Sequence, residues 1–381
     1  RLHFETEASE KLAAKTASLT PEGLNRIFFV SGGSEAVESG IKLARQYAVA
    51  TGQSSRWKVI SRFPSYHGST FGALAITGYD PLTIPFEPLM RSMPKVPAPR
   101  AYLDRLDPED EATGRHYADM LEQKIIEEGP DTVLAFFVEP VGGASTGALV
   151  PPKGYMERVQ EICRQYGVLL ILDEVMTGAG RTGKFLASEH WGLTPDIVVM
   201  SKGFAAGYVP LGAMAAHDRL IEPVLDAGGF QHGYTYAGNP LACAAGLAVI
   251  EEIERQDMIA NAERMGVYLQ SRLKDLMQRY AVIGDVRGKG LLTAFEFVSD
   301  RRTMAPLPAS LAAHDRFVNI AYEKGLIVCS RRTRGGTEGD HILVCPPMIV
   351  NEHQIEEIID MLDSSLRQFT SEIQSALPQS A

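Results

Sequence analysis

The stretch Val168–Gly183 reads VLLILDEVMTGAGRTG. It begins as an apolar run that stops at Asp173 and Glu174, and a glycine-rich loop follows. An apolar run of this length, bounded by polar and glycine residues, is typical of a fully buried strand in a parallel sheet. Ligands of open α/β sheets bind beyond the carboxyl ends of such strands, so Asp173 is placed to meet a ligand. On these residues alone, Asp173 could equally cap a turn or pair with a nearby base.

The composition is that of an ordinary globular protein. Of 381 residues, 45% are apolar and 22% charged, and the net charge is −10. The acidic balance argues against nucleic acid or an anionic membrane as a partner, and no apolar stretch reaches membrane-spanning length. The cysteines, Cys163, Cys243, Cys329 and Cys345, form no CxxC pair, which predicts a reduced, cytoplasmic protein with no metal site and no disulfide framework. Because the chain starts at Arg1 inside a helix-like segment, we expect that N-terminal residues are missing.

Apolar strands alternate with helical segments along most of the chain. The pattern predicts strands at 26–30, 57–63, 131–138, 168–172, 196–200 and 211–216, and helices at 5–19, 35–50, 116–128, 154–166, 240–256, 258–280, 311–324 and 352–374. We therefore expect an α/β protein with a large, mostly parallel sheet domain over 1–256, a connecting helix over 257–280 and a smaller α+β domain over 281–381. Residues 79–115 lack periodicity and are expected to form a long surface excursion.

Two loops that follow strands could bind a planar, phosphorylated ligand. The first strand runs into a glycine turn with Gly33 and Ser34 at the start of a helix. Free N–H groups and the helix dipole favour anions there, and glycine allows a close approach. Tyr66 and His67 follow the second strand and could stack on a ring. Taken singly, each loop could also be an ordinary packed turn.

Polar groups at four strand ends should meet at one sheet edge: Glu139, Asp173, Lys202 and the Gly33-Ser34 turn. Lysine is rarely buried unless it is paired or functional. A desolvated lysine has a lowered pKa and becomes a nucleophilic amine suited to Schiff-base chemistry. The alternative is a partly buried ion pair between Lys202 and Asp173. An aldehyde cofactor also needs an acid at its ring nitrogen, a phosphate site and a stacking plane, and Asp173, the Gly33-Ser34 turn with Thr235, and Tyr66 can fill those roles.

Several specific motifs occur in a characteristic order: FFVSGGSEAVESGIKLAR, YHGST, FFVEPV, LILDEVMTGAGRTGKF, PDIVVMSKGF, YTYAGNPLACAAGLA and GDHILVCPP. In these motifs the chain resembles the class III aminotransferases, from about residue 5 to about residue 370. These are pyridoxal 5'-phosphate (PLP) enzymes of fold type I. The resemblance implies a large, mostly parallel seven-stranded sheet with helices on both faces and a smaller α+β C-terminal domain.

The resemblance also assigns roles at the cofactor. Lys202 would form the Schiff base with the cofactor and move the proton between substrate and cofactor, and Asp173 would bind the pyridine nitrogen. Val175 and Tyr66 would pack on the two faces of the ring. The remaining implied cofactor contacts are Gly33, Ser34, His67, Glu139 and Thr235. In the family, the residue matching Thr235 comes from the neighbouring subunit, which implies an obligate homodimer with shared active sites.

Two departures from the family pattern bear on the substrate. Members that act on ornithine, acetylornithine or 4-aminobutyrate resemble EPIQGE and RFAPP where this chain has EPVGGA and LVCPP, so Ala144 and Leu343 replace a gating glutamate and an arginine. This is similar to the ω-amine:pyruvate transaminases, and implies transfer from an ω-amine or ω-amino acid to a keto acid such as pyruvate. A keto-acid carboxylate needs a cation. Arg331, Arg332 and Arg334 are candidates, although each could equally belong to a solvated basic loop. A PLP-dependent epimerase or aminomutase of the same fold would share the core residues and is the alternative.

Overall fold

The large sheet of the protein is mostly parallel, as the sequence predicts. The computed structural model describes residues 5–376. Seven strands pair in the order β1-β7-β6-β5-β4-β2-β3, and β7 alone runs opposite to the others. They are β1 (Arg26–Val30), β2 (Lys58–Phe63), β3 (Lys95–Pro97), β4 (Val133–Val138), β5 (Leu169–Asp173), β6 (Ile197–Met200) and β7 (Gly212–Ala216).

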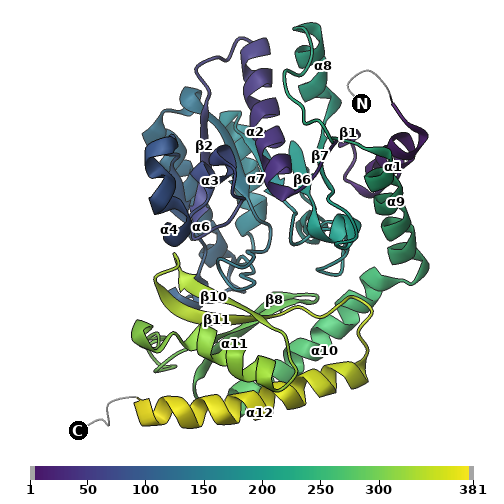
Figure 1. Ribbon diagram of the computed structural model, residues 1–381. Helices are drawn as coiled ribbons and strands as arrows, with labels where there is room; N and C mark the ends of the chain where they lie inside the picture. The colour runs from purple at the N-terminus through teal and green to yellow at the C-terminus, as the bar shows by residue number, and fades with distance from the viewer. Residues whose placement is uncertain (1–4, 377–381) are drawn as a thin grey trace.

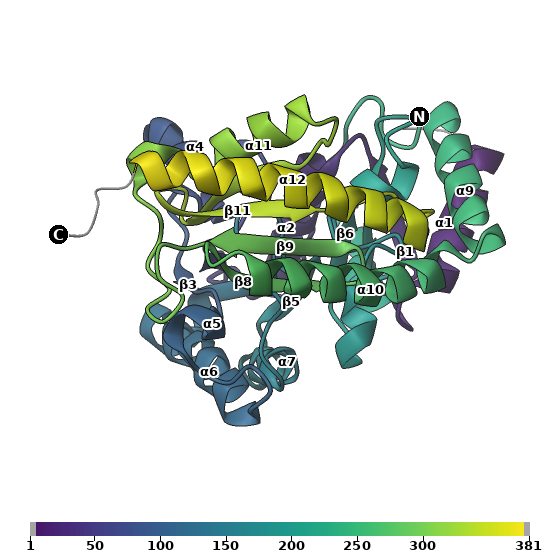
Figure 2. The ribbon, with the colours of Figure 1, turned by 90° about the horizontal axis from the view of Figure 1, so that it is seen from below.

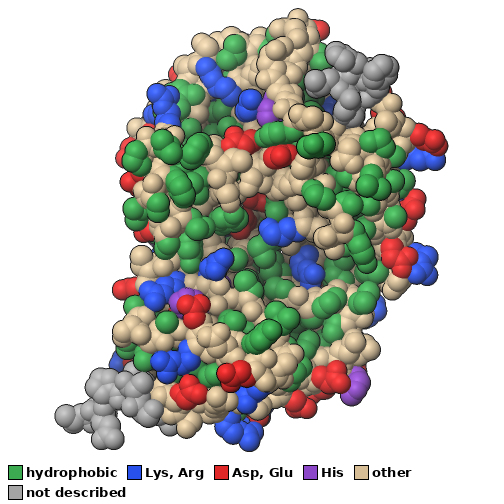
Figure 3. Space-filling view, in the orientation of Figure 1, with side chains coloured by type: hydrophobic (Ala, Val, Ile, Leu, Met, Phe, Trp, Pro, Cys, Tyr) green, Lys and Arg blue, Asp and Glu red, His purple; other side chains and the backbone are tan. Residues whose placement is uncertain are grey.

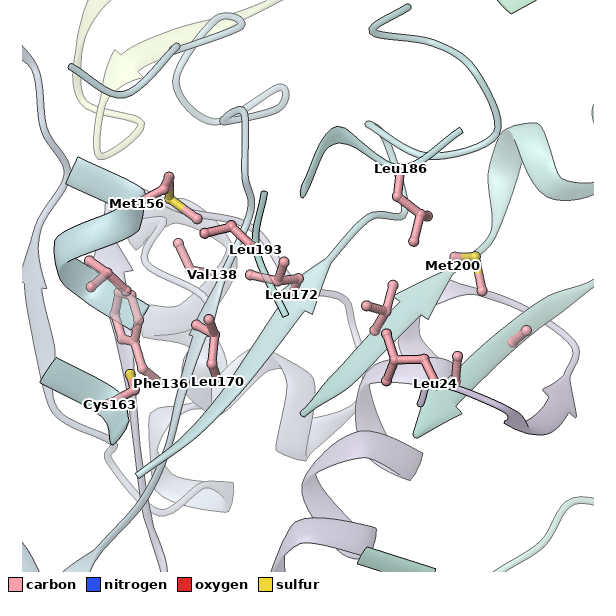
Figure 4. Close-up of a cluster of buried hydrophobic side chains, with 14 of the residues drawn as sticks. Leu24, Phe136, Val138, Met156, Cys163, Leu170, Leu172, Leu186, Leu193 and Met200 are labelled. Atoms are coloured by element: carbon pink, nitrogen blue, oxygen red, sulfur yellow. The ribbon is translucent and has the colours of Figure 1, made fainter. Parts of the chain in front are cut away.

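Helices cover both faces of this sheet (Figure 1). Alternate residues of β5 point to opposite faces, so Leu170 and Leu172 join one buried cluster while Leu169 and Ile171 join another. Burial on both faces explains why these strands are continuous apolar runs. Figure 4 shows part of the first cluster. The covering helices are α1 (Glu7–Leu19), α2 (Gly33–Ala50), α3 (Phe71–Ile76), α6 (Glu111–Glu128), α7 (Tyr155–Tyr166), α8 (Asp218–Asp226) and α9 (Pro240–Arg255).

The C-terminal part has its own antiparallel sheet, in the order β10-β11-β9-β8. Its strands are β8 (Ile283–Lys289), β9 (Leu292–Phe297), β10 (Cys329–Arg334) and β11 (Glu338–Val344), and its helices are α10 (Met258–Arg279), α11 (Ala313–Glu323) and α12 (Glu352–Ala376). The sheet lies between these helices and the large part (Figures 1 and 2). Its core includes Phe297 stacked on Phe369, with ring centroids 4.6 Å apart. The expected smaller α+β unit is therefore present.

Residues 79–115 contain more regular structure than the sequence suggests. They include α4 (Asp80–Thr83), the 3-10 helix η1 (Ile84–Leu89), α5 (Ala101–Asp104) and β3, which pairs with β2 at the sheet edge. The helix predicted at 116 begins at Glu111, where Asp110 caps it by accepting from the Ala112 N–H at 2.9 Å. Elements of three to six residues are too short to show a helical or strand period, and for this reason the sequence pattern missed them.

The loop GAGRTG, to which the sequence assigned no role, joins the two parts of the molecule. The Arg181 guanidinium donates to the carbonyl oxygen of Pro346 at 2.5 Å, and the Arg181 carbonyl accepts from the N–H of Leu291 at 3.1 Å. Both partners belong to the C-terminal part. The glycines therefore serve close packing between the parts: a Cβ on Gly180 would lie 2.9 Å from Ile259.

Candidate active site

Most of the predicted cofactor residues line one cavity of about 210 Å³. The cavity lies at the carboxyl ends of β2, β4, β5 and β6, where a parallel sheet gathers the residues that follow its strands. The residues that the structure brings together there are Gly33, Ser34, Tyr66, His67, Glu139, Asp173, Val175 and Lys202. Thr235 is not among the lining residues and its side chain is exposed.

Asp173 is buried, and the protein holds both of its carboxylate oxygens. Oδ1 accepts from the Val175 N–H at 3.1 Å, and Oδ2 lies 2.8 Å from Nδ1 of His67. The His67 ring packs edge-on against Phe137, with centroids 5.1 Å apart. Sequence reasoning placed His67 in the site but missed its bond to Asp173. The pair fixes the carboxylate in one orientation while leaving it open toward the cavity.

Lys202 lines the cavity and has an unusual backbone conformation. Its φ of 44° lies in the left-handed region, which costs a non-glycine residue on the order of 1–3 kcal/mol and is characteristic of functional sites. Burial lowers the pKa of its amine, although Asp173 and Glu139 act in the opposite direction. Within residues 5–376, Asp173 pairs with His67 and no ion pair to Lys202 is formed. Lys202 is therefore a candidate nucleophile, and it is not half of the salt bridge that the sequence left open as an alternative.

Glu139 connects the cofactor cavity to the loop that follows β4. Its Oε1 accepts from the Gly143 N–H at 2.8 Å, and its Oε2 lies 3.4 Å from the N–H of Tyr66. Its main-chain carbonyl accepts from the buried Arg62 at 2.6 Å. Burial raises the pKa of Glu139. The residue thus positions Tyr66 and the loop carrying Ala144, which both line the cavity.

The start of α2 is open toward the same cavity. The helix begins at Gly33, and its N-cap residue, Gly32, makes no side-chain capping bond. A Cβ on Gly33 would lie 3.1 Å from Val175, so a larger residue would crowd this wall. The Ser34 hydroxyl accepts from the Ser69 N–H at 3.0 Å. Uncapped N–H groups beside a hydroxyl form a site suited to an anion such as phosphate.

The chain matches the family described as aminotransferase class-III over residues 1–366. The chain belongs to the class III aminotransferases. Relatives of this aminotransferase include the uncharacterized aminotransferase YodT of Bacillus subtilis, which is 38% identical over 96% of this chain and 83% of the relative. The putrescine–pyruvate aminotransferase of Pseudomonas aeruginosa is 32% identical over 94% of this chain and 76% of its own length. A thermostable (S)-enantioselective omega-transaminase from Thermomicrobium roseum superposes with a TM-score of 0.90, at 36% identity, over 96% of this chain and 80% of that one.

Class III aminotransferases depend on PLP, and the cavity of this aminotransferase fits that cofactor. Lys202 offers the amine that an aldehyde requires, and the buried Asp173 offers an anion for a ring nitrogen. The uncapped start of α2 offers N–H groups for a phosphate. Tyr66 and Val175 supply flat and branched apolar surfaces for a ring. The residues that line the cavity therefore fit the ring, the aldehyde and the phosphate, and Thr235, which was expected to reach the phosphate, is not among them.

A second cavity of about 720 Å³ adjoins the first and shares Tyr66, Ala144, Met176 and Lys202 with it. Figure 3 shows the hollow between the two parts of the aminotransferase, with Lys and Arg side chains inside it. This cavity continues from the reactive amine to the surface, and we assign it to the substrate.

Of the three candidate arginines, Arg331 alone lines the substrate cavity. The three arginines lie on strand β10 and not in a loop, and they alternate between the faces of that strand. Arg332 donates to the carbonyl oxygens of Thr337 and Ala309, at 2.7 and 2.8 Å, and Arg334 donates to that of Met304 at 2.6 Å. The side chains of Arg332 and Arg334 therefore stabilise neighbouring main-chain segments and do not line the cavity.

Sequence reasoning missed most of the apolar wall of the substrate cavity. The missed residues are Leu74, Tyr79, Leu82, Phe86, Met176, Ile327, Val328, Cys329 and Cys345. Three of them, Tyr79, Leu82 and Phe86, come from the 79–115 excursion, whose length is typical of functional loops. That signal indicated a role for the excursion without indicating which side chains face the site.

Proposed function

We propose that this aminotransferase transfers an amino group from an ω-amine or ω-amino acid to a keto acid such as pyruvate. The observation that carries the proposal is the position of Arg331 in the cavity that opens from Lys202. Ala144 and Leu343 line the same cavity, so neither a glutamate nor an arginine occupies those two places. Arg331 is the cation available for a keto-acid carboxylate, because guanidinium binds carboxylate through two parallel hydrogen bonds.

The chain's own residues divide the chemistry between them. PLP, when bound, supplies an aldehyde for amines and a ring that takes up electrons. Lys202 Nζ removes the proton from the donor carbon that bears nitrogen, and returns a proton in the second half of the cycle. Asp173, oriented by His67, keeps a proton on the ring nitrogen.

We propose further that the active enzyme is a homodimer with shared sites. Thr235 is exposed and lies outside its own chain's cavity, and it is followed by the exposed side chains of Tyr236 and Leu241, which are 75% and 74% accessible. Exposed apolar groups of this size favour a subunit interface. In such a dimer, Thr235 of one subunit would complete the phosphate site of the other.

Mixed dimers test the shared site. Lys202→Ala and Thr235→Asp should each be inactive alone, and refolding the two together should restore activity. In the mixed dimer, one site receives Lys202 from one chain and Thr235 from the other. If Thr235 serves its own chain, no mixture recovers activity, and the shared-site proposal fails.

The reaction itself is tested with purified PLP-loaded enzyme, pyruvate and a panel of amines. Formation of alanine, together with an aldehyde or ketone, is the expected result. An amine added without acceptor should change the visible absorption of the bound cofactor, and Lys202→Ala should lack this response. Scrambling of an amino acid's configuration without net amine transfer would instead indicate the epimerase.

The expected cellular location remains a proposal as well. The cysteines are scattered and form no CxxC pair, which supports a reducing, cytoplasmic environment. Among the described residues, none of the helices has both the length and the apolar character that a membrane span requires.

A further inference from the structure

The walls of the substrate cavity carry charge of one sign only. Among the described residues that line it, Arg331 is the cation that stays charged while Lys202 serves as the reactive amine, and no aspartate or glutamate is present. A cavity for a doubly cationic substrate would need a carboxylate at the far end. This cavity offers none within the part of the chain that the structure describes.

An apolar path runs from the reactive amine to the surface. At the inner end of this path, Met176 lines the cavity together with Lys202. Leu343 lines it as well and belongs to the apolar cluster that Ala144 packs against. At the mouth, Leu82, Phe86 and Ile327 line the cavity while exposing 39%, 45% and 82% of their surface. Large apolar side chains rarely remain exposed around a functional cavity unless a ligand or partner covers them.

The apolar lining favours a donor with an apolar chain, whereas the positive charge disfavours a donor with a second ammonium group. An alkyl or aryl chain gains free energy by removing these walls from water, and a cavity of about 720 Å³ has room for such a chain. A second ammonium group would leave water without a counter-ion. It would also approach the like charge of Arg331, which raises its free energy further.

We propose that the donor is a primary amine with an apolar tail, and that the cavity discriminates against diamines. This inference rests on the proposed function and narrows its donor class. The relative from Pseudomonas aeruginosa is named for putrescine, a diamine, so the two donor classes are real alternatives within the family. Arg331 remains free for the keto acid in the second half of the reaction.

Hexylamine and hexane-1,6-diamine form a matched pair of donors, since they differ only by a distal ammonium group. With PLP-loaded wild-type enzyme and pyruvate, alanine formation should give a kcat/KM at least about tenfold higher for hexylamine, after halving the diamine value for its two amines. Equal or higher values for the diamine would overturn this inference and leave the proposed amine transfer intact. Absence of alanine with every amine would overturn the proposed function, and this inference with it.

A carboxylate placed at the mouth should reverse the preference. Phe86→Glu should shift the hexylamine-to-diamine ratio toward the diamine by at least about fivefold, because the new anion can pair with the distal ammonium. The matched control is Leu89→Glu, which changes a 66% exposed residue of the same helix η1 that does not line the cavity. Leu89→Glu should leave the ratio unchanged.

Equal ratios in Phe86→Glu and Leu89→Glu would overturn the inference. If Phe86→Glu fails to fold, Leu82→Glu introduces the same charge at another mouth position and is subject to the same comparison.

Discussion

At the scale of single residues, the carboxylate of Asp173 is held by His67, and substitution of either residue tests the cofactor site. Asp173→Asn keeps the size of the side chain and removes its charge, so it can no longer hold a proton on the ring nitrogen. We expect kcat to fall by about 100-fold or more with little change in the thermal unfolding midpoint. His67→Phe should produce a smaller loss, because the carboxylate remains but its orientation is released. Steady-state kinetics beside thermal unfolding separate the two effects; retained turnover in Asp173→Asn would refute the assignment.

The neighbouring carboxyl, Glu174, supplies a pH dependence. It is fully buried, and burial raises its pKa from 4.5 to about 7, against hydrogen bonds from Thr177, Ala187 and Ser188. A folded-state pKa above the unfolded value means that the folded protein binds more protons, so stability falls as pH rises from about 4.5 to about 7. The loss amounts to about 3 kcal/mol at most. In Glu174→Gln, the thermal unfolding midpoint should vary less with pH across this range. An unchanged pH dependence would contradict the raised pKa of Glu174.

Residue-scale prediction from sequence succeeded where a residue directly follows a strand. Lys202 and Asp173 were located because strand order brings strand ends together. The contact of His67 with Asp173 joins a loop to the end of β5, 106 positions apart in the chain, and no local pattern encodes such a contact. The role of Arg331 depended on which face of β10 it occupies, and the sequence pattern placed this arginine in a loop.

At the scale of elements, a buried polar cluster ties the small sheet to the loop after β4. Arg287 on β8 donates to Glu296 on β9 and to the Thr146 carbonyl, both at 2.8 Å, and stacks 4.3 Å from the ring of Tyr102. Removing one partner of a buried ion pair typically costs about 3–5 kcal/mol. We expect Arg287→Met to lose stability of this order in denaturant unfolding, and to raise KM because the loop carrying Ala144 is released.

An exposed pair provides the control for this cluster. Arg302 lies 3.5 Å from Asp300 and is 81% accessible, so Arg302→Met should cost less than about 1 kcal/mol and leave KM unchanged. Similar changes in stability and KM in Arg287→Met and Arg302→Met would show that Arg287 contributes no more than an exposed ion pair does. The sequence predicted an α+β unit in this region, but it could not predict a buried arginine, because the burial of Arg287 depends on its contacts with Thr146 and Tyr102 of the large part.

At the scale of the whole molecule, the alternation of apolar strands and helices predicted a large, mostly parallel sheet domain and a smaller α+β domain, and the family resemblance implied helices on both faces of the large sheet. It did not predict how the parts join. The joint is the loop GAGRTG, where Arg181 has its pKa lowered by burial and donates to main-chain carbonyls of the C-terminal part. A planar guanidinium can reach both Pro346 and Leu291, whereas a lysine ammonium is a single compact donor.

Arg181→Lys therefore tests whether this joint supports catalysis. The cavity between Arg181 and Met348 also contains Lys202, so loosening the joint should disturb the position of the reactive amine. We expect kcat to fall by about tenfold, with PLP still bound, because misplacing a catalytic group by a fraction of an ångström is costly. Hydrogen exchange should accelerate at the Leu291 amide, which donates to the Arg181 carbonyl. Lys184→Met, which removes a cation three positions further along the chain, should change neither quantity. Faster exchange with an unchanged kcat would make the joint a structural contact without influence on the reaction.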